Sequence, residues 1–347
     1  MSSKNIRHAK GATITDVAKK AGVSIKTVSR VMNKEANVTE ATAEKVQSAA
    51  KALNYEPNLS ARMLAGSKSF SIGLIYENPH EFSYLKRVLD GIFDVCGKQG
   101  YSLLLKPCLT PKEGLLDEIQ QFIKQTRVDG VILIAPLGDV PELNQYLVEE
   151  AIPFAQISPN NDDEHALVAH CDDQLAALNM TEHVIALGHR HIGFIKGHPD
   201  HGATDLRYQG YLQALKKHGI KTDEKLVEQG YFDFESGQRA GEKLLKQSPR
   251  PTAIIASNDD MAAGANFVAR ELKLDVPAEL SITGFDDTPT AAHLWPPLTT
   301  VKQPITSMAS SSTERLIAWI RGDAPTKNVE SFHCELVIRR STAKPPE

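Results

Sequence analysis

Polar residues that directly follow hydrophobic segments are the first candidates for binding chemistry in this sequence. Tyr76 and Glu77 follow the run IGLI, Asn258 follows AIIAS, and Asp286 follows SITGF. Such runs predict buried strands, and α/β proteins bind ligands beyond the carboxyl ends of parallel strands. Carboxylate and amide groups form paired hydrogen bonds with hydroxyl groups. These four residues are therefore candidates for binding a small polar molecule.

Other polar clusters suggest chemistry that the rest of the sequence does not support. Four histidines fall within 13 residues, and zinc sites use clustered histidines: His189, His191, His198 and His201. Because His191 starts a predicted strand, we expect the four side chains to diverge, and we predict no metal site. The aspartate pairs ending at Asp260 and Asp287 lack an accompanying nucleophile, phosphate-binding glycine loop or cofactor fingerprint. We therefore predict no catalytic residues, no cofactor and no enzymatic activity.

Charge is divided unevenly along the 347 residues. Residues 1–68 hold 12 Lys and Arg against 5 Asp and Glu, a net charge of +7, whereas the remainder carries −11. A small basic head on an acidic body indicates that only the head contacts a polyanion. A solvated basic helix without a partner is the alternative interpretation.

The basic head has the pattern of three short helices. Thr13-Ile-Thr-Asp16 forms a capping box for the first helix, and Gly22 ends it. Ser24 can cap a second helix, and Thr39 opens a third helix with one apolar stripe. Three helices with a short turn between the first two predict a helix-turn-helix bundle of about 55 residues.

The second helix, at about residues 25–32, has the features of a helix that reads DNA. Its apolar Val28 and Val31 are expected to pack inward. Four other residues are expected to be exposed near its N-terminal half: Ile25, Lys26, Ser29 and Arg30. Side chains at that end of a helix reach base edges in the major groove. Lysine and arginine donate to guanine there, while isoleucine offers apolar contact to a thymine methyl group.

From Phe70 onward, short apolar strands alternate with amphipathic helices. The predicted strands are 71–76, 101–106, 128–135, 153–157, 191–197, 252–257 and 280–285. The predicted helices lie near 81–99, 112–125, 139–150, 173–187, 204–218, 236–247 and 259–272. This alternation indicates an α/β fold with doubly wound parallel sheets. The number of elements predicts two such subdomains with a cleft between them.

The sequence also bears on the cellular compartment. Its N-terminus has no apolar segment of the kind that signal peptides carry, and no apolar run approaches the roughly 18 residues that span a bilayer. The four cysteines have no C-x-x-C spacing, as expected for reduced thiols. We therefore predict a cytoplasmic protein without a membrane partner.

Two motifs resemble the LacI/GalR family of bacterial transcriptional regulators. They are TITDVAKKAGVSIKTVSRVMN at residues 13–33 and YEPNLSARMLAG at residues 55–66, the latter similar to the family's hinge. The body continues the resemblance to about residue 340 through LGHRHIGFI, DLRYQGY, ASNDDMAAG, SITGFDD and PLTTVKQP. The resemblance thus covers nearly the whole chain.

The resemblance implies a domain organisation. An all-α helix-turn-helix head spans residues 1–57, and a hinge helix with a linker spans 58–69. A core like a periplasmic binding protein spans 70–340, with two doubly wound subdomains for effector binding and dimerisation, and a tail spans 341–347. The chain is expected to cross between the subdomains near residue 168 and within residues 288–305.

The same resemblance implies roles at the DNA. Base edges are read by Ile25, Lys26, Ser29 and Arg30, and phosphates are contacted by Thr15, Ser24, Thr27 and Asn33. Asn58, Ala61 and Leu64 belong to the hinge helix, and paired hinge helices place Leu64 in a minor-groove base step. Paired wedges imply a homodimer on a pseudo-palindromic operator.

The resemblance also implies which residues meet a small effector: Tyr76, Glu77, Phe82, Asp172, Arg207, Phe232, Asn258 and Asp286. Aromatic rings in this set, with Tyr84 and Trp295 as further candidates, can cover the apolar face of a sugar; core packing is the alternative for each. Because an anion would need more cationic donors than Arg207 alone, the chemistry favours a neutral mono- or disaccharide, with a nucleoside as the alternative.

Together these observations predict a sequence-specific repressor, switched by a small sugar and controlling genes of carbohydrate catabolism. Whether the effector lowers or raises operator affinity is left open. Two alternatives are a sugar-binding transport receptor and a sugar-modifying enzyme with a DNA-binding head. The basic head argues against the first, and the lack of a catalytic constellation argues against the second.

Overall fold

A computed structural model of the chain describes residues 12–32, 38–55, 68–77, 82–108, 114–323 and 325–346. The chain forms two compact units, Met1–Phe70 and Ser71–Glu347, called here the head and the core. Within the described residues, no helix combines the length and apolar character needed to cross a membrane. The α/β class predicted from the sequence is confirmed.

The head is the predicted bundle of three helices, α1 (Ile14–Ala21), α2 (Ile25–Met32) and α3 (Glu40–Ala52). Thr13 caps α1 through the predicted capping box, in which its backbone N–H donates to the Asp16 carboxylate at 2.8 Å. Gly22 ends α1 in the left-handed conformation, at φ 68°, which glycine adopts without steric cost. One fully buried valine from each helix forms the centre of its core: Val17, Val28 and Val46.

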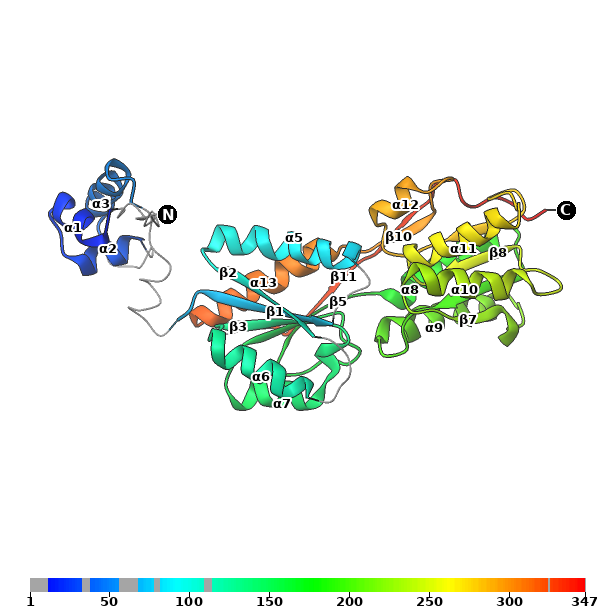
Figure 1. Ribbon diagram of the computed structural model, residues 1–347, viewed down its shortest axis with the longest axis horizontal. Helices are drawn as coiled ribbons and strands as arrows, with labels where there is room; N and C mark the ends of the chain where they lie inside the picture. The colour runs from blue at the N-terminus through cyan, green and yellow to red at the C-terminus, as the bar shows by residue number, and fades with distance from the viewer. Residues whose placement is uncertain are drawn as a thin grey trace, which may run out of the picture. The chain divides into compact units, whose positions relative to one another are not determined.

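The first sheet of the core has six strands in the order β11-β5-β4-β3-β1-β2, all parallel. They are β1 (Ser71–Glu77), β2 (Ser102–Cys108), β3 (Gly130–Ile134), β4 (Phe154–Ile157), β5 (Leu167–Cys171) and β11 (Val329–Phe332). Figure 1 shows α5 (Phe82–Gln99) and α13 (Ile305–Arg321) over one face, and α6 (Leu115–Thr126) and α7 (Pro141–Glu149) over the other. The short 3-10 helix η1 (Leu137–Asp139) follows β3.

The second sheet has four parallel strands in the order β7-β6-β8-β9. They are β6 (Ile192–Lys196), β7 (Val227–Gln229), β8 (Ala253–Ala256) and β9 (Ser281–Thr283), with the 3-10 helix η2 (Glu224–Leu226) before β7. Helices α8 (Asp173–Ala186) and α9 (Gly202–Lys217) share one hydrophobic cluster with the sheet. Helices α10 (Phe234–Leu245) and α11 (Asp259–Glu271) share the other, so both faces are covered.

The chain crosses between the two sheets three times. The first crossing joins β5 to α8, and the second joins β10 (Thr300–Lys302) to α13. The third joins β11 to β12 (Glu335–Val337), which pairs with β10 in an antiparallel ribbon. The sequence predicts the first two crossings but not the third, because β11 and β12 are too short to show a clear pattern.

The last described residues are part of the second subdomain rather than a detached tail. The Ser341 carbonyl accepts from Ile282 N at 2.9 Å, and the Ser341 Oγ accepts from Thr299 N at 2.8 Å. The Ala343 N–H donates to Ser281 Oγ at 3.0 Å. These bonds attach the end of the chain beside β9.

Candidate effector cleft and DNA-binding surface

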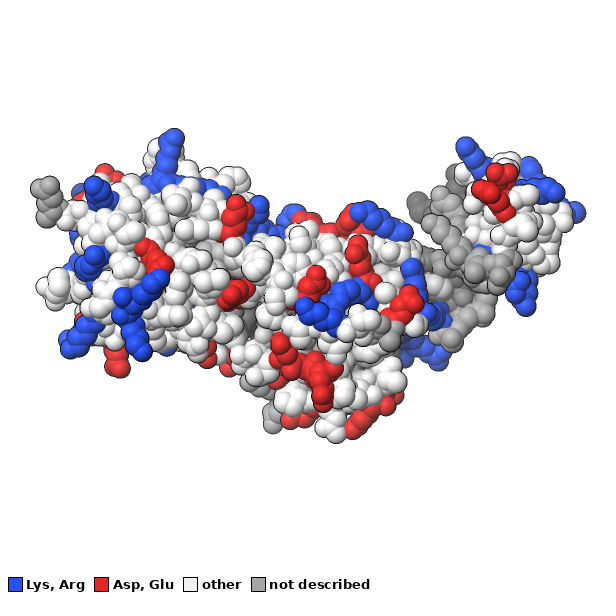
Figure 2. All heavy atoms as spheres, turned by 180° about the vertical axis from the view of Figure 1, so that it is seen from behind, with Lys and Arg blue, Asp and Glu red and all other residues white. Residues whose placement is uncertain are grey.

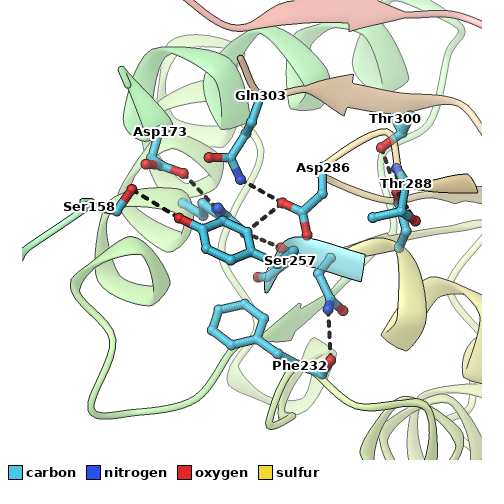
Figure 3. A network of polar contacts seen from close by, with 12 residues as sticks. Ser158, Asp173, Phe232, Ser257, Asp286, Thr288, Thr300 and Gln303 are labelled. Carbon is cyan, nitrogen blue, oxygen red and sulfur yellow. Dashed lines mark hydrogen bonds and ion pairs between the residues drawn. The ribbon is translucent and has the colours of Figure 1, made fainter. Parts of the chain in front are cut away.

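A buried guanidinium lies where the first crossing enters the second subdomain. Arg207, in the second turn of α9, donates from Nε to Asp173 Oδ1 at 2.7 Å and from Nη1 to the Ser257 carbonyl at 2.5 Å. Its Nη1 also lies 3.8 Å from Asp286 Oδ1. These partners stand at the start of α8 and at the carboxyl ends of β8 and β9 (Figure 3). The carboxyl ends of the strands are where the sequence predicted ligand-binding residues.

Negative groups outnumber positive ones in this buried cluster. Asp173, Asp259 and Asp286 are all at least 95 % buried beside the single guanidinium of Arg207. Burial raises the pKa of Asp286 to about 7 although Arg207 and Gln303 oppose the shift. Burial, with repulsion from Asp286, raises the pKa of Asp259 to about 8. Burial disfavours the Arg207 charge, but Asp173 and Asp286 more than offset it and raise the pKa of Arg207. The cluster therefore keeps its cation, while Asp259 and Asp286 hold their protons to higher pH than free carboxyl groups do.

This arrangement predicts a pH dependence of stability. Because the Asp286 pKa is raised from 3.8 to about 7 in the folded chain, the folded state retains a proton that the unfolded state loses. The stabilising contribution of Asp286 is complete below pH 3.8 and is lost as pH rises toward 7. The free energy of unfolding of the Asp286→Asn variant, taken relative to that of wild type, should rise by up to about 4 kcal/mol between pH 4 and pH 7. Denaturant unfolding at several pH values measures this difference.

The matched control is Asp205→Asn, because Asp205 is an exposed carboxylate on the same helix as Arg207. A plot of its free energy of unfolding against pH should run parallel to that of wild type. A parallel profile for Asp286→Asn as well would show that Asp286 is ionised in the folded protein throughout this range.

Two further contacts fix the position of Asp286. Gln303, on the second crossing, donates from Nε2 to Asp286 Oδ1 at 2.5 Å. Arg87 of α5 donates to the backbone carbonyls of Asp286, at 2.9 Å, and Asp287. Arg87 belongs to the first subdomain and Asp286 to the second, so this contact joins the two subdomains directly beside the buried cluster.

Aromatic rings border the guanidinium. The Arg207 guanidinium lies 3.8 Å from the centre of the Phe285 ring and 5.7 Å from that of Phe232. The Phe232 backbone is left-handed, at φ 64°, and its carbonyl accepts from Asn258 Nδ2 at 2.7 Å. The His201 ring lies 5.5 Å from that of Phe232. This wall of rings beside carboxyl groups has the chemistry that covers the apolar face of a sugar and binds its hydroxyls.

The predicted effector residues are not all placed alike. Arg207, Phe232, Asn258 and Asp286 are buried around the cluster, and Tyr76 and Glu77 are half-buried at the end of β1. The side-chain amide of Asn258 also accepts from Met261 N at 2.9 Å, so it caps α11. Asp172 is exposed and caps α8, accepting from Leu175 N at 3.0 Å. The side chain of Phe82 lies outside what the structure describes.

Sequence reasoning missed Asp173, Ser257 and Gln303. Asp173 is the more buried member of an Asp-Asp pair, because the N-cap residue of α8 stays outside the helix while the next residue turns inward. The adjacent pair was the available signal. Nothing in the local sequence marks Gln303, which joins the cluster because the second crossing brings it there.

The four histidines do not gather at one point, although two of them lie close together. His189 is buried, and its ring contacts Thr252, Ser281 and the Ala343 carbonyl at 2.9 to 3.1 Å. His191 contacts the Pro249 carbonyl at 2.9 Å, while the His198 and His201 rings lie 5.4 Å apart. In the part of the chain that the structure describes, no group of three or more His, Cys, Asp or Glu side chains is arranged to hold a metal ion.

The second helix of the head presents the predicted DNA-reading residues. Ile25 is 49 % exposed, Lys26 and Arg30 are exposed, and Val28 and Val31 are buried. Ser29 is half-buried on the same helix, and Thr15 is exposed on α1. Figure 2 shows Lys and Arg side chains spread over one face of the head, with the acidic side chains of that face in a single group. A polyanion can approach such a surface.

The predicted phosphate-binding residues Ser24 and Thr27 contact each other at the start of α2. The Ser24 Oγ accepts from Thr27 N at 3.1 Å and lies 2.8 Å from Thr27 Oγ1. The other predicted positions, Asn33 and the hinge residues Asn58, Ala61 and Leu64, lie outside the described residues.

A helix-turn-helix head joined to a core of two parallel-sheet subdomains defines a class of ligand-responsive transcription regulators. Residues 13–58 match the family model for bacterial regulatory proteins of the lacI family. Residues 181–342 match the family model for the periplasmic binding protein-like domain. The chain belongs to the LacI family of bacterial regulatory proteins, and it is a DNA-binding transcriptional repressor of that family.

Relatives of nearly the same length support this assignment. The chain is 35 % identical to the transcriptional repressor PurR of Pectobacterium carotovorum, covering 96 % of this chain and 98 % of that protein. It is 32 % identical to the PurR of Pasteurella multocida, covering 95 % and 98 %. Among solved structures, the lac repressor dimer bound to operator and the anti-inducer ONPF is 30 % identical, with a TM-score of 0.76 and coverage of 96 % and 100 %. A complex of the regulator CelR with cellobiose is 29 % identical, with a TM-score of 0.73 and coverage of 95 % and 99 %.

Proposed function

We propose that this repressor binds a pseudo-palindromic operator as a homodimer and is switched by a small neutral sugar, a mono- or disaccharide. Its targets would be genes of carbohydrate catabolism, in the cytoplasm, without catalysis of its own. The observation that carries the effector assignment is the buried cluster of Arg207 with Asp173 and Asp286. The Arg207 guanidinium is already paired with the Asp173 carboxylate, 2.7 Å away, and lies 3.8 Å from Asp286, so it offers an anionic ligand little attraction.

The aromatic wall supports the same assignment. Phe232 and His201 present rings beside carboxyl and carbonyl acceptors, and the CelR relative is a complex with cellobiose. A nucleoside is the second candidate, because a base can stack on the same rings. The name PurR, which the curated relatives carry, does not by itself distinguish the two for this chain.

The motifs support the proposed domain division. The helix-turn-helix domain is assigned to residues 1–57, the hinge to 58–69, and the effector-binding and dimerisation core to 70–340, with 341–347 as the terminal segment. The hinge residues Asn58, Ala61 and Leu64 are proposed to enter the minor groove, and Asn33 to contact phosphate, as the resemblance implies.

The decisive experiment titrates the full-length protein onto DNA from upstream of its own and neighbouring genes. It is run at one stated salt concentration, because phosphate contacts make affinity depend steeply on salt. The panel contains glucose, galactose, cellobiose, adenosine and glucose 6-phosphate. One neutral sugar should change operator affinity by about 5- to 150-fold, and chromatography should recover that sugar unaltered. A response only to adenosine selects the nucleoside, and a response only to the sugar phosphate refutes the charge argument.

Base reading by α2 gives a separate prediction. Lys26→Ala should weaken binding to the operator about 10- to 100-fold and relax preference at one base position, because a bidentate contact to guanine is lost. Lys45→Ala on α3 removes the same charge from an exposed position outside α2. It should weaken operator and random DNA equally and only slightly. If Lys26→Ala also weakens binding to operator and to random DNA equally, Lys26 contacts a phosphate rather than a base.

A further inference from the structure

Two cysteines lie at the crossings between the subdomains. Cys171 is the last residue of β5, at the first crossing, and Cys334 lies between β11 and β12, at the third. The Cys334 thiol is a neighbour of the Cys171 thiol and raises its pKa. The Cys171 thiol also donates to Gln303 Oε1, on the second crossing, at 3.2 Å. One residue from each of the three crossings therefore meets at Cys171.

Strand pairing explains why these two thiols meet. β5 and β11 are parallel neighbours in which Phe332 is the partner of Cys171. Cys334 follows two residues later, as the chain leaves the sheet toward β12. Both thiols are free in the structure. Cys96 and Cys108, in contrast, are buried within α5 and β2 of the first subdomain.

Each of the two cysteines borders space that solvent can occupy. Cys334 is half-buried rather than buried. Cys171 is only 2 % exposed, but it lines a cavity of about 300 Å³ together with Ser158, Asp173 and Leu206. This cavity lies between the end of the first sheet and the start of α9, so it borders both subdomains.

We propose that Cys171 and Cys334 are an oxidation site, at which a hydroperoxide converts the two thiols into a disulfide that ties the first crossing to the third. The Cys334 sulfur attacks the peroxide O–O bond, forming the sulfenic acid Cys334–SOH and releasing an alcohol, or water from hydrogen peroxide. The Cys171 sulfur then attacks the Cys334 sulfur. The S–S bond forms, the S–O bond breaks, and the Cys171 proton leaves with the expelled hydroxide as water. The two thiols lose two electrons, which the peroxide gains.

The surroundings assign the two roles. Contact with the Cys334 thiol, burial, and the nearby Asp173 carboxylate together raise the pKa of Cys171. Cys171 is therefore a poor first nucleophile, and the more exposed Cys334 reacts first. Once Cys334 carries oxygen, Cys171 is the thiol already in contact with it.

The disulfide would alter the effector cluster as well as the crossings. Cys171 would lose its S–H, which lies 3.2 Å from Gln303 Oε1 and 3.5 Å from Asp173 Oδ2. Gln303 and Asp173 hold Asp286 and Arg207. If the subdomains move relative to each other when effector binds, as the proposed function requires, a bond between two of three crossings would restrict that motion. Oxidation would then uncouple effector from operator.

The test treats the full-length protein with hydrogen peroxide and measures intact mass, free thiols after denaturation, and peptides under non-reducing conditions. Wild type should lose about 2 Da, retain two of its four thiols, and yield a peptide cross-linked between Cys171 and Cys334. The double variant C96S/C108S should do the same. Cys334→Ser should form no cross-link, and Cys171→Ser, with its partner intact, should stop at the sulfenic acid, which a dimedone adduct reveals.

A second readout tests the effect on the crossings without needing an effector. Amide hydrogen exchange in residues 171–173 and 333–335 should slow about tenfold on oxidation and recover on reduction. Addition of two or three oxygen atoms to Cys334 without a cross-link overturns the proposal, as does a disulfide between any other pair. A cross-link without slower exchange overturns the restriction of the crossings. None of these results depends on which effector the protein binds.

Discussion

Replacing Arg207 by methionine should lower the free energy of unfolding at pH 7 by about 3–5 kcal/mol and abolish effector binding. The variant leaves Asp173 buried without the guanidinium 2.7 Å away and removes the donor to the Ser257 carbonyl. Removing one partner of a buried ion pair is costly because the other charge stays unpaired away from water. Denaturant unfolding measures the stability, and calorimetry with the active sugar measures the binding.

Two comparisons isolate the electrostatic cause of this loss. Arg239→Met, at an exposed position of α10, should change stability by less than about 0.5 kcal/mol. Adding Asp173→Asn to Arg207→Met should restore part of the lost stability, because the unpaired carboxylate is removed. A double variant as unstable as the single one would show that packing of Arg207 against Phe285, rather than its charge, is what matters.

Placing an aspartate at Phe267 should convert the proposed dimer to a monomer and weaken operator binding at least 100-fold. Phe267 on α11 is 43 % exposed, and its ring lies 5.9 Å from that of Phe234, which is 37 % exposed on α10. Arg270, one turn later, donates to the carbonyl of Trp295, whose side chain is 69 % exposed. Exposed aromatic clusters of this kind mark protein interfaces, and one head alone covers only half of a palindromic site.

Sedimentation and operator titration, run on the same samples, test this prediction. The control is Leu175→Asp, because Leu175 is 46 % exposed on α8, which covers the opposite face of the second sheet. It should remain dimeric and bind operator normally. A dimeric Phe267→Asp variant with full operator affinity would place the subunit interface elsewhere.

The sequence predicted the regular elements well where a strand and helix alternated with clear periodicity. All seven predicted strands and all seven predicted helices of the core are present. The largest missed element is α13, because Ser310-Ser-Ser-Thr313 at its centre has poor helix propensity. In the structure, that segment packs against α5, where a Cβ on Gly91 would come within 2.5 Å of the Thr306 carbonyl. Tertiary packing between small residues overrides the local preference.

The site was predictable where it follows from strand ends and not where it follows from chain crossings. Asp286 was found because it stands just beyond a recognisable strand, and Arg207 was found because the family resemblance implied it. Gln303 and Cys334 come from crossings, and only the three-dimensional path of the chain brings them beside Cys171. Arg87 was missed for a related reason, since its partners are backbone carbonyls about 200 residues away, which no side-chain pattern reveals.

The three crossings also constrain when each subdomain can finish folding during synthesis. Strand β11 completes the first sheet by pairing with β5, although the whole second sheet is synthesised between them. The second sheet, in turn, receives its last bonds from Ser341 and Ala343. Neither subdomain is continuous in sequence, so the usual folding of domains one after another on the ribosome cannot be completed for either. A chain arrested near residue 300 would carry two unfinished sheets with open edges, and such edges pair readily with other chains.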